Sequence, residues 1–138
     1  LWLEAGDEAM DKEFHGHYDI WGGDIDPAAV DLARHNAELA GVEDCIRFEV
    51  ADAGKFHRDS EYGQLVTNPP YGERLLEKKE AEELYRVFGA ALRDLPPKWR
   101  VLVLSSHTEF ERCFGKQAGK KRKLYNGMIK CDVFMYGK

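Results

Sequence analysis

The chain has 138 residues and a formal net charge of −5, with 43% hydrophobic and 33% charged residues. These values are ordinary for one globular domain with a hydrophobic core, and they exclude a low-complexity or disordered chain. No apolar run approaches the roughly 20 residues that a membrane-spanning helix needs, and no secretory signal pattern is present. The acidic balance argues against nucleic-acid binding through the whole surface, but a local basic patch could still serve.

Cysteine and histidine usage bounds the compartment and the metal chemistry. The three cysteines, Cys45, Cys113 and Cys131, lie far apart and form no C-x-x-C spacing. Such usage is typical of a reducing compartment, so we expect a cytoplasmic protein. His15 and His17 lack a nearby third ligand, and we expect a polar loop there and no metal site. The chain begins Leu-Trp-Leu without an initiator methionine, so we interpret it as a piece of a longer protein.

The first half of the chain alternates helix and strand signals. Residues 1–17 predict a helix that leads into a loop. Asp26 and Pro27 predict the start of a second helix, because aspartate caps free N–H groups and proline suits the first helical position. Gly41 stands where this helix should stop. The predicted strands of this half cover residues 18–25, 46–50 and 64–68.

The second half carries the strongest amphipathic pattern. Apolar residues recur three or four apart from Ala81 to Leu95, which predicts a helix that Pro96 and Pro97 end. The charged residues 73–79 before it are expected to be exposed. A strand over residues 99–105 and a short helix over residues 108–114, capped by Ser106 or Thr108, are expected next.

The C-terminal segment predicts a hairpin. Asn126-Gly127 separates two strand-like runs, residues 120–125 and 128–136, and is a strong two-residue turn signal. Taken in order, the elements predict an α/β fold with a doubly wound, mostly parallel sheet and an antiparallel C-terminal hairpin at one edge. Ligands of such open sheets bind beyond the carboxyl ends of the strands, so we expect the candidate site residues there.

The most informative stretch is Asn68-Pro69-Pro70-Tyr71, which follows the third strand. Two consecutive prolines end the strand and stiffen an extended loop. The loop presents the Asn68 amide, backbone carbonyls and the Tyr71 ring. An amide oxygen and a carbonyl can accept both N–H bonds of an exocyclic amino group while the ring stacks on the base. The alternative is a Pro-rich turn after a buried strand.

This Asn-Pro-Pro-Tyr motif resembles the catalytic loop of amino-group methyltransferases that use S-adenosylmethionine. Its extension by Gly-Glu-Arg resembles the S-adenosylmethionine-dependent RNA guanine-N2 methyltransferase family, in particular the large-subunit rRNA methylases that carry a THUMP domain. Lys-Leu-Tyr-Asn-Gly at residues 123–127 is similar to a further pattern of that family. The resemblance implies a Rossmann-like methyltransferase sheet, S-adenosylmethionine as cofactor, large-subunit rRNA as partner and catalytic roles for Asn68, Pro69, Pro70 and Tyr71.

The same resemblance assigns cofactor-binding residues. Gly-Gly-Asp-Ile-Asp-Pro at residues 22–27 is similar to the family's second motif. It implies that Asp24 binds the cofactor ribose and that Ile25 packs on the adenine. Asp52 would accept a hydrogen bond from the adenine amino group, beside the backbone N–H of Ala53, and Asn68 completes this set. The alternatives are a turn or cap role for Asp24, an exposed acid at Asp52, and a metal-binding Asp-x-Asp of glycosyltransferases at residues 24–26.

Substrate contacts are expected at two places. Glu73 would accept from guanine N1–H and Arg74 would hold a phosphate, the alternative being a local surface ion pair. Lys121, Arg122 and Lys123 belong to the dense basic patch of the chain and are expected to contact the RNA backbone. The alternative there is a solvated edge strand, since lysines on an edge also deter aggregation.

The family's first strand and Gly-rich cofactor loop are not found in the sequence, so residues 1–138 are interpreted as a partial methyltransferase catalytic domain. A sheet without its central strand would expose unpaired backbone groups, which favours self-association. The expected function is methyl transfer from S-adenosylmethionine to the N2 amino group of a guanine in rRNA. The rivals are adenine-N6 or cytosine-N4 methylation of DNA or RNA, and a non-catalytic RNA-binding or assembly module. No membrane partner is expected.

Overall fold

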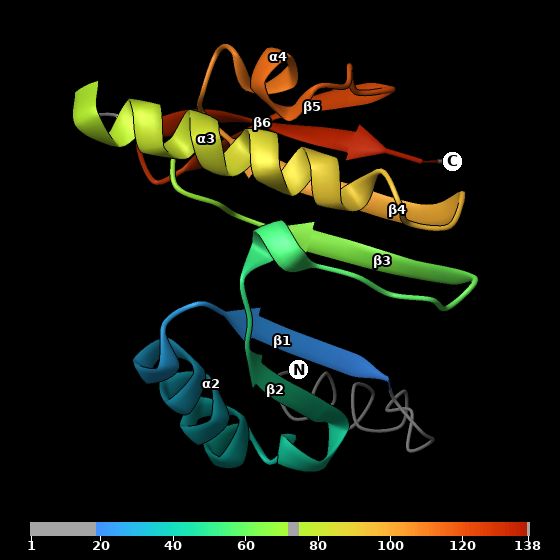
Figure 1. Ribbon diagram of the computed structural model, residues 1–138. Helices are drawn as coiled ribbons and strands as arrows, with labels where there is room; N and C mark the ends of the chain where they lie inside the picture. Colours follow the sequence, from blue (N-terminus) through green and yellow to red (C-terminus); the bar gives the residue numbers. More distant parts are fainter. Residues whose placement is uncertain (1–18, 72–74, 138) are drawn as a thin grey trace, which may run out of the picture. The chain divides into compact units, whose positions relative to one another are not determined.

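The structure is a computed structural model that describes residues 19–71 and 75–137. It consists of two compact units, which meet in sequence between Val50 and Ala51. Figure 1 shows the elements of each unit. The predicted helix over residues 1–17, with His15 and His17, lies outside the described residues.

Unit 1 is built from two strands and one long helix. Its elements are β1 (Ile20–Asp24), α2 (Pro27–Ala40), the 3-10 helix η1 (Glu43–Cys45) and β2 (Ile46–Val50). The strands pair in parallel, with Ile20 opposite Ile46 and Asp24 opposite Val50. α2 contacts both strands, and its buried residues are Val30 and Ala37.

The ends of α2 follow from local chemistry. The Asp26 side chain accepts a hydrogen bond from the Ala28 N–H at 3.0 Å, and Pro27 is the first helical residue. Gly41 follows the last turn with a φ of 74°, a conformation that glycine adopts without strain. The predicted start and stop of this helix are therefore confirmed.

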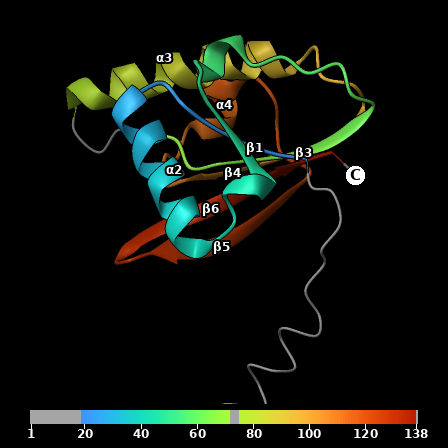
Figure 2. The ribbon, with the colours of Figure 1, turned by 90° about the horizontal axis from the view of Figure 1, so that it is seen from below.

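Unit 2 is a mixed sheet covered on one face by two helices. The elements are η2 (Ala53–Lys55), β3 (Tyr62–Thr67), α3 (Leu75–Leu92), β4 (Lys98–Ser105), α4 (Phe110–Phe114), β5 (Lys120–Asn126) and β6 (Ile129–Tyr136). The strand order is β3-β4-β6-β5, with β3 parallel to β4 and the other pairs antiparallel. α3 and α4 lie on the same side of this sheet (Figure 2).

Aromatic rings fill the space between these helices and the sheet. Phe110 of α4 stacks on Phe134 of β6 with ring centroids 4.6 Å apart, and meets Tyr85 of α3 edge-on at 4.9 Å. Phe114 packs against Phe110 at 5.1 Å. Offset and edge-on pairs of this kind add stability beyond the area that they bury. This cluster fixes α3 and α4 on the sheet.

Several predicted boundaries are wrong. α3 begins at Leu75 instead of Ala81, so charged residues form its first turns, and it ends at Leu92, ahead of the prolines. α4 begins after Glu109 and has no side-chain cap, so neither Ser106 nor Thr108 caps it. The hairpin loop consists of Gly127 and Met128, because Asn126 pairs with Ile129 in the ladder. Gly127 has a φ of 65°, which suits the first loop position of a type II′ turn.

The expected α/β class is confirmed, with parallel strand pairs and an antiparallel C-terminal hairpin. Within the described residues, β1 pairs with β2 alone and β3 pairs with β4 alone, so each has an unpaired edge. No helix in the described part of the chain is long and apolar enough to cross a membrane.

We predict that Gly89→Ala destabilises the chain although alanine is the better helix former. A Cβ at Gly89 would lie 2.0 Å from the Phe114 carbonyl oxygen, where α3 passes α4. Helix propensity alone would stabilise by about 1 kcal/mol. The clash should outweigh this gain and lower the free energy of unfolding by about 1–3 kcal/mol, measured by urea denaturation.

The matched control is Ala90→Gly, at the next and exposed position of α3. It should cost about 1 kcal/mol through propensity alone. A Gly89→Ala chain that is as stable as the original would contradict the close packing of α3 on α4.

Candidate active site

The Asn-Pro-Pro-Tyr loop lies at the carboxyl end of β3. The strand ends at Thr67, and the parallel strand β4 ends at the same edge of the sheet, at Ser105. Asn68 and Pro70 are exposed, whereas Pro69 and Tyr71 are partly buried. Asn68 is thus accessible to a ligand, as expected of a group that binds one.

Tyr71 is held by the hairpin. The Asn126 side-chain amide donates a hydrogen bond to the Tyr71 hydroxyl, with Nδ2 3.0 Å from Oη. Burial raises the pKa of Tyr71, the Asn126 amide lowers it, the neighbouring Cys131 thiol raises it, and the Asn68 amide lowers it slightly. The net pKa lies above the ordinary value, so Tyr71 is a neutral phenol at physiological pH.

The loop is also held from below by Tyr85 of α3. Its ring is fully buried, and its hydroxyl donates a hydrogen bond to the Pro70 carbonyl. The same hydroxyl lies 3.2 Å from the Ser105 Oγ at the end of β4. Burial raises the pKa of Tyr85, so this hydroxyl stays protonated and remains a donor.

His107 is buried next to this pair. Its Nδ1 lies 3.0 Å from the Glu109 backbone N–H, and its Nε2 lies 3.1 Å from a carboxylate oxygen of Glu82. A backbone N–H can only donate, so Nδ1 accepts. In this tautomer Nε2 carries the ring hydrogen and donates a hydrogen bond to the Glu82 carboxylate.

The predicted cofactor residues are divided between the units. Asp24 and Ile25 follow β1 in unit 1, and both are exposed. Asp52 and Ala53 belong to unit 2, at the start of η2. The roles of these four residues toward a cofactor stay predictions.

Both aspartates have a structural role that leaves room for a ligand. Asp24 Oδ1 accepts from the Asp26 N–H at 2.9 Å, and Asp52 Oδ1 accepts from the Gly54 N–H at 2.9 Å. The second oxygen of each carboxylate has no hydrogen-bond partner among the described residues. Free carboxylate oxygens suit the hydroxyls of a ribose and the amino group of an adenine, so these residues fit a nucleoside cofactor.

The predicted RNA-binding residues of β5 lie on two different faces. Lys121 and Lys123 stand opposite Phe134 and Asp132 in the ladder, whereas Arg122 stands opposite Val133. Neighbouring residues of a strand point to opposite faces. Lys121 is engaged there, because its ammonium group pairs with the Glu111 carboxylate and lies over the Phe134 ring. The charge of Lys121 is therefore already balanced.

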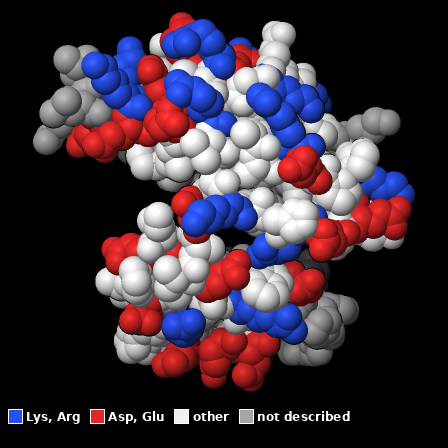
Figure 3. Space-filling model, viewed as in Figure 1, with Lys and Arg blue, Asp and Glu red and all other residues white. Residues whose placement is uncertain are grey.

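Figure 3 shows Lys and Arg side chains interspersed with Asp and Glu over the face drawn. Glu73 and Arg74 lie outside the described residues. Within the described ranges, no group of three or more His, Cys, Asp or Glu side chains is arranged to hold a metal ion.

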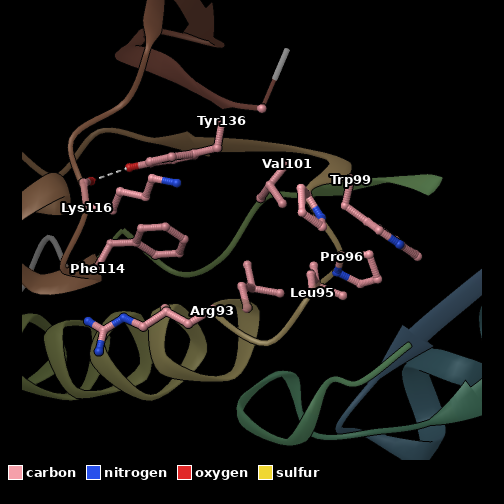
Figure 4. Close-up of a pocket in the computed structure, with 12 residues that line it drawn as sticks. Arg93, Leu95, Pro96, Trp99, Val101, Phe114, Lys116 and Tyr136 are labelled. Atoms are coloured by element: carbon pink, nitrogen blue, oxygen red, sulfur yellow. Dashed lines mark hydrogen bonds between the residues drawn. The ribbon is translucent and has the colours of Figure 1, made fainter. Parts of the chain in front are cut away.

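A cavity of about 230 Å³ lies at the other end of the unit 2 sheet. Leu95, Trp99, Phe114 and Tyr136 contribute to its lining, and the Tyr136 hydroxyl donates to the Lys116 carbonyl at 2.8 Å (Figure 4). No residue of the Asn-Pro-Pro-Tyr loop lines this cavity. It is therefore separate from the candidate active site.

Sequence reasoning missed Tyr85 and Asn126 as partners of the loop. One signal for Tyr85 was present, because Ala81, Tyr85 and Phe88 recur at helical spacing and all are buried. A tyrosine on a buried helix face needs a partner for its hydroxyl. Asn126 precedes a glycine in a turn signal, and nothing in that pattern indicates that its side chain reaches Tyr71.

Residues 2–134 match the family described as RMKL-like, methyltransferase domain. The chain belongs to this family. The resemblance first noted on the Asn-Pro-Pro-Tyr motif is therefore confirmed.

Curated relatives of this methyltransferase-domain family are much longer than the chain. YpsC of Bacillus subtilis, named provisionally as an RNA methyltransferase, is 43% identical over 99% of the chain and 35% of its own length. Ribosomal RNA large subunit methyltransferase K/L of Shewanella baltica is 37% identical over 99% of the chain and 20% of its own length. The chain thus spans about a third or less of these relatives.

Solved structures give the same result for the fold. A protein of Clostridium difficile, titled provisionally as a methylase, superposes with a TM-score of 0.92 at 44% identity, over 99% of the chain and 36% of its own. SMU.472, titled provisionally as a methyltransferase, was solved with SAH. It superposes with a TM-score of 0.90 at 38% identity, over 99% of the chain and 36% of its own. A Listeria monocytogenes protein, titled as an N6-adenine-specific DNA methylase by prediction, superposes with a TM-score of 0.86 at 40% identity, over 99% of the chain and 35% of its own.

We predict that Asn126→Ala raises the pKa of Tyr71 further. The Asn126 amide donates to the Tyr71 oxygen and favours its ionised form, so its removal shifts the pKa upward. Asn68→Ala should shift it in the same direction but less, since Asn68 contributes less. The measurement is an NMR pH titration of ring-labelled tyrosine.

The control is Met128→Ala, in the same hairpin loop at a side chain that is 98% exposed. It should leave the Tyr71 titration unchanged. An unshifted pKa in Asn126→Ala would mean that the amide does not hold the hydroxyl in solution.

Proposed function

We propose that this chain is the catalytic part of an S-adenosylmethionine-dependent methyltransferase that modifies the N2 amino group of a guanine in rRNA. The observation that carries the proposal is the rigid Asn-Pro-Pro-Tyr loop at a strand end, with Asn68 exposed and Tyr71 anchored. Membership of a methyltransferase-domain family supports it. The relative named for large-subunit rRNA supports the choice of substrate.

The loop would position an amino group that is a poor nucleophile. The lone pair of an exocyclic nitrogen is delocalised into the base. Acceptance of its two N–H bonds by the Asn68 amide oxygen and the Pro69 carbonyl would pyramidalise the nitrogen and direct its lone pair. Tyr71 would stack on the base and fix its plane. Catalysis would then rest on positioning and electrostatics, without a strong base before attack.

S-adenosylmethionine, when bound, supplies an electrophilic methyl group on a sulfonium. Transfer of this methyl group to the amino nitrogen would release the cofactor as a neutral thioether, and the methylated nitrogen would then lose a proton. Asp24 and Asp52 would hold the cofactor through the oxygens that the backbone leaves free. The SAH-bound neighbour supports this choice of cofactor.

The acceptor base must be unpaired or flipped out, since the amino group of a base inside a helix cannot reach the loop. A second candidate function is adenine-N6 methylation, because the Asn-Pro-Pro-Tyr core suits any exocyclic amino group and the Listeria neighbour is titled for that activity. Mass spectrometry of nucleosides from a deletion strain separates the two. Loss of N2-methylguanosine from rRNA is expected, and loss of N6-methyladenosine instead would overturn the guanine assignment.

We predict that Asn68→Ala, made in the complete protein, lowers kcat far more than it weakens cofactor binding. Asn68 would contact the acceptor nitrogen, so its loss should cost about 10²–10³-fold in kcat, the range seen for one positioned hydrogen-bonding group. Asp24→Ala should do the reverse and weaken cofactor binding with a smaller effect on kcat. Single-turnover kinetics and calorimetry with S-adenosylhomocysteine measure the two quantities, and equal losses in both would contradict these roles.

We also predict that Arg122→Ala weakens RNA binding more than Lys121→Ala does. Arg122 lies on the opposite face of β5 from Lys121, whose charge the Glu111 carboxylate already balances. Loss of one phosphate contact should reduce the slope of log K against log salt by about 0.7–0.9. Binding titrations of rRNA fragments at several salt concentrations give this slope. An equal effect of both variants would show that the ion pair opens on binding.

A further inference from the structure

A buried tyrosine of α3 connects the Asn-Pro-Pro-Tyr loop to the core of unit 2. Tyr85 has 0% of its surface exposed, and its hydroxyl bonds to the Pro70 carbonyl. Its ring is fixed by Phe110 at 4.9 Å and by His107 at 5.6 Å, both edge-on. The hydroxyl therefore reaches the loop from a rigid position.

The protons of this contact can be assigned by counting donors and acceptors. The Pro70 carbonyl can only accept, so the Tyr85 O–H donates to it. The contact between Tyr85 and Ser105 must then use the Ser105 O–H as donor. The Ser105 oxygen in turn accepts from the backbone N–H of His107 at 3.1 Å. The result is a chain of hydrogen bonds that runs in one direction toward the loop, and such chains strengthen each member.

The far end of this chain is also fixed. His107 is held by Glu82 on one ring nitrogen and by the Glu109 N–H on the other. Glu82 and Tyr85 lie on neighbouring turns of α3. Among the described residues, no buried side-chain N or O atom lacks a hydrogen-bond partner, so the network is fully satisfied. A fully satisfied buried network specifies one arrangement.

The loop depends on outside contacts because of its own sequence. Pro69 and Pro70 have no N–H, so they cannot donate the backbone hydrogen bonds that hold ordinary turns. The Pro70 carbonyl belongs to the peptide that links Pro70 to Tyr71, so the Tyr85 bond orients that peptide. The Asn126 amide holds Tyr71 at its hydroxyl. Tyr71 is thus fixed at both ends, while the Pro69 carbonyl is left for the acceptor amino group.

We infer that Tyr85 is a positioning residue that holds the Asn-Pro-Pro-Tyr loop in the geometry needed for methyl transfer, with Ser105 directing its hydroxyl. This role rests on the proposed function. Tyr85 contacts neither the acceptor nor the cofactor in this scheme and acts through the Pro70–Tyr71 peptide. It differs in that respect from Asn68 and Tyr71.

Tyr85→Phe tests the inference, because it removes the hydroxyl and keeps the ring. The matched control is Tyr136→Phe: Tyr136 is also buried and also donates to a backbone carbonyl, that of Lys116, at the opposite end of the sheet (Figure 4). In the complete protein, Tyr85→Phe should lower kcat by about 10- to 100-fold, as expected for a misplaced reacting group. Its affinity for S-adenosylhomocysteine should stay within about twofold. Tyr136→Phe should lower only the melting temperature.

A second readout does not require activity. Hydrogen exchange, followed on peptides that cover residues 62–76, should become faster at the Asn68 and Tyr71 amides in Tyr85→Phe and stay unchanged in Tyr136→Phe. If exchange is faster in Tyr85→Phe but the wild-type protein methylates no guanine, the proposed function is overturned, while the structural role of Tyr85 in holding the loop stands. Unchanged exchange together with unchanged kcat would overturn the inference.

A Tyr85→Phe protein that does not fold would leave Ser105→Ala as the test. That variant keeps the Tyr85 hydroxyl and removes the group that directs it. It should change exchange and kcat in the same direction by a smaller amount. No change in a folded Ser105→Ala protein would overturn the inference.

Discussion

The arrangement of unit 2 around the Asn-Pro-Pro-Tyr loop depends on a shortage of backbone donors. Pro69 and Pro70 give the loop a stiff, extended path, but they remove the N–H groups that would hold it in place. The contacts that hold it come from elements distant in the sequence, namely Tyr85 of α3 and Asn126 of β5. The loop is therefore stiff by its own sequence and placed by the fold.

The position of Tyr85 is set in turn by the packing of α3. Gly89 allows α3 to pass close to the Phe114 carbonyl of α4, and the rings of Phe110 and Phe134 fill the space beneath. Tyr85 and Gly89 are four residues apart, about one turn of α3. A shift of α3 along its axis at Gly89 would therefore also move Tyr85 away from Pro70. Core packing and loop geometry are thus two parts of one constraint.

The sequence predicted those features whose causes are local. The start of α2 at Asp26 and Pro27, its stop at Gly41 and the strand β2 follow from capping, glycine conformation and alternation, which act within a few residues. Other features depend on distant partners. Asn126 reads locally as a loop residue, but the ladder pairs it with Ile129 and its amide turns to Tyr71. The burial of His107 likewise depends on tertiary contacts that no short pattern contains.

The basic run on β5 shows the same limit in electrostatic terms. A sequence shows Lys121, Arg122 and Lys123 as one cluster, but a strand sends alternate side chains to opposite faces. One face places Lys121 against Glu111, and each partner stabilises the charge of the other: the ion pair raises the pKa of Lys121 and lowers that of Glu111. A count of charges in the sequence therefore overstates the charge available for an RNA backbone.

The chemistry of the loop agrees with a reaction that needs position more than proton abstraction. Burial raises the pKa of both Tyr71 and Tyr85, so both phenols are neutral at physiological pH and act as hydrogen-bonding groups, not as bases. His107 uses Nδ1 as an acceptor and Nε2 as a donor inside the fold, so neither nitrogen is available to take a proton from a substrate. An amino group becomes acidic only after it has gained the methyl group. The described side chains that hold the loop, those of Tyr85 and Asn126, are neutral, so neither would take the proton of the amino group, which would be left to solvent.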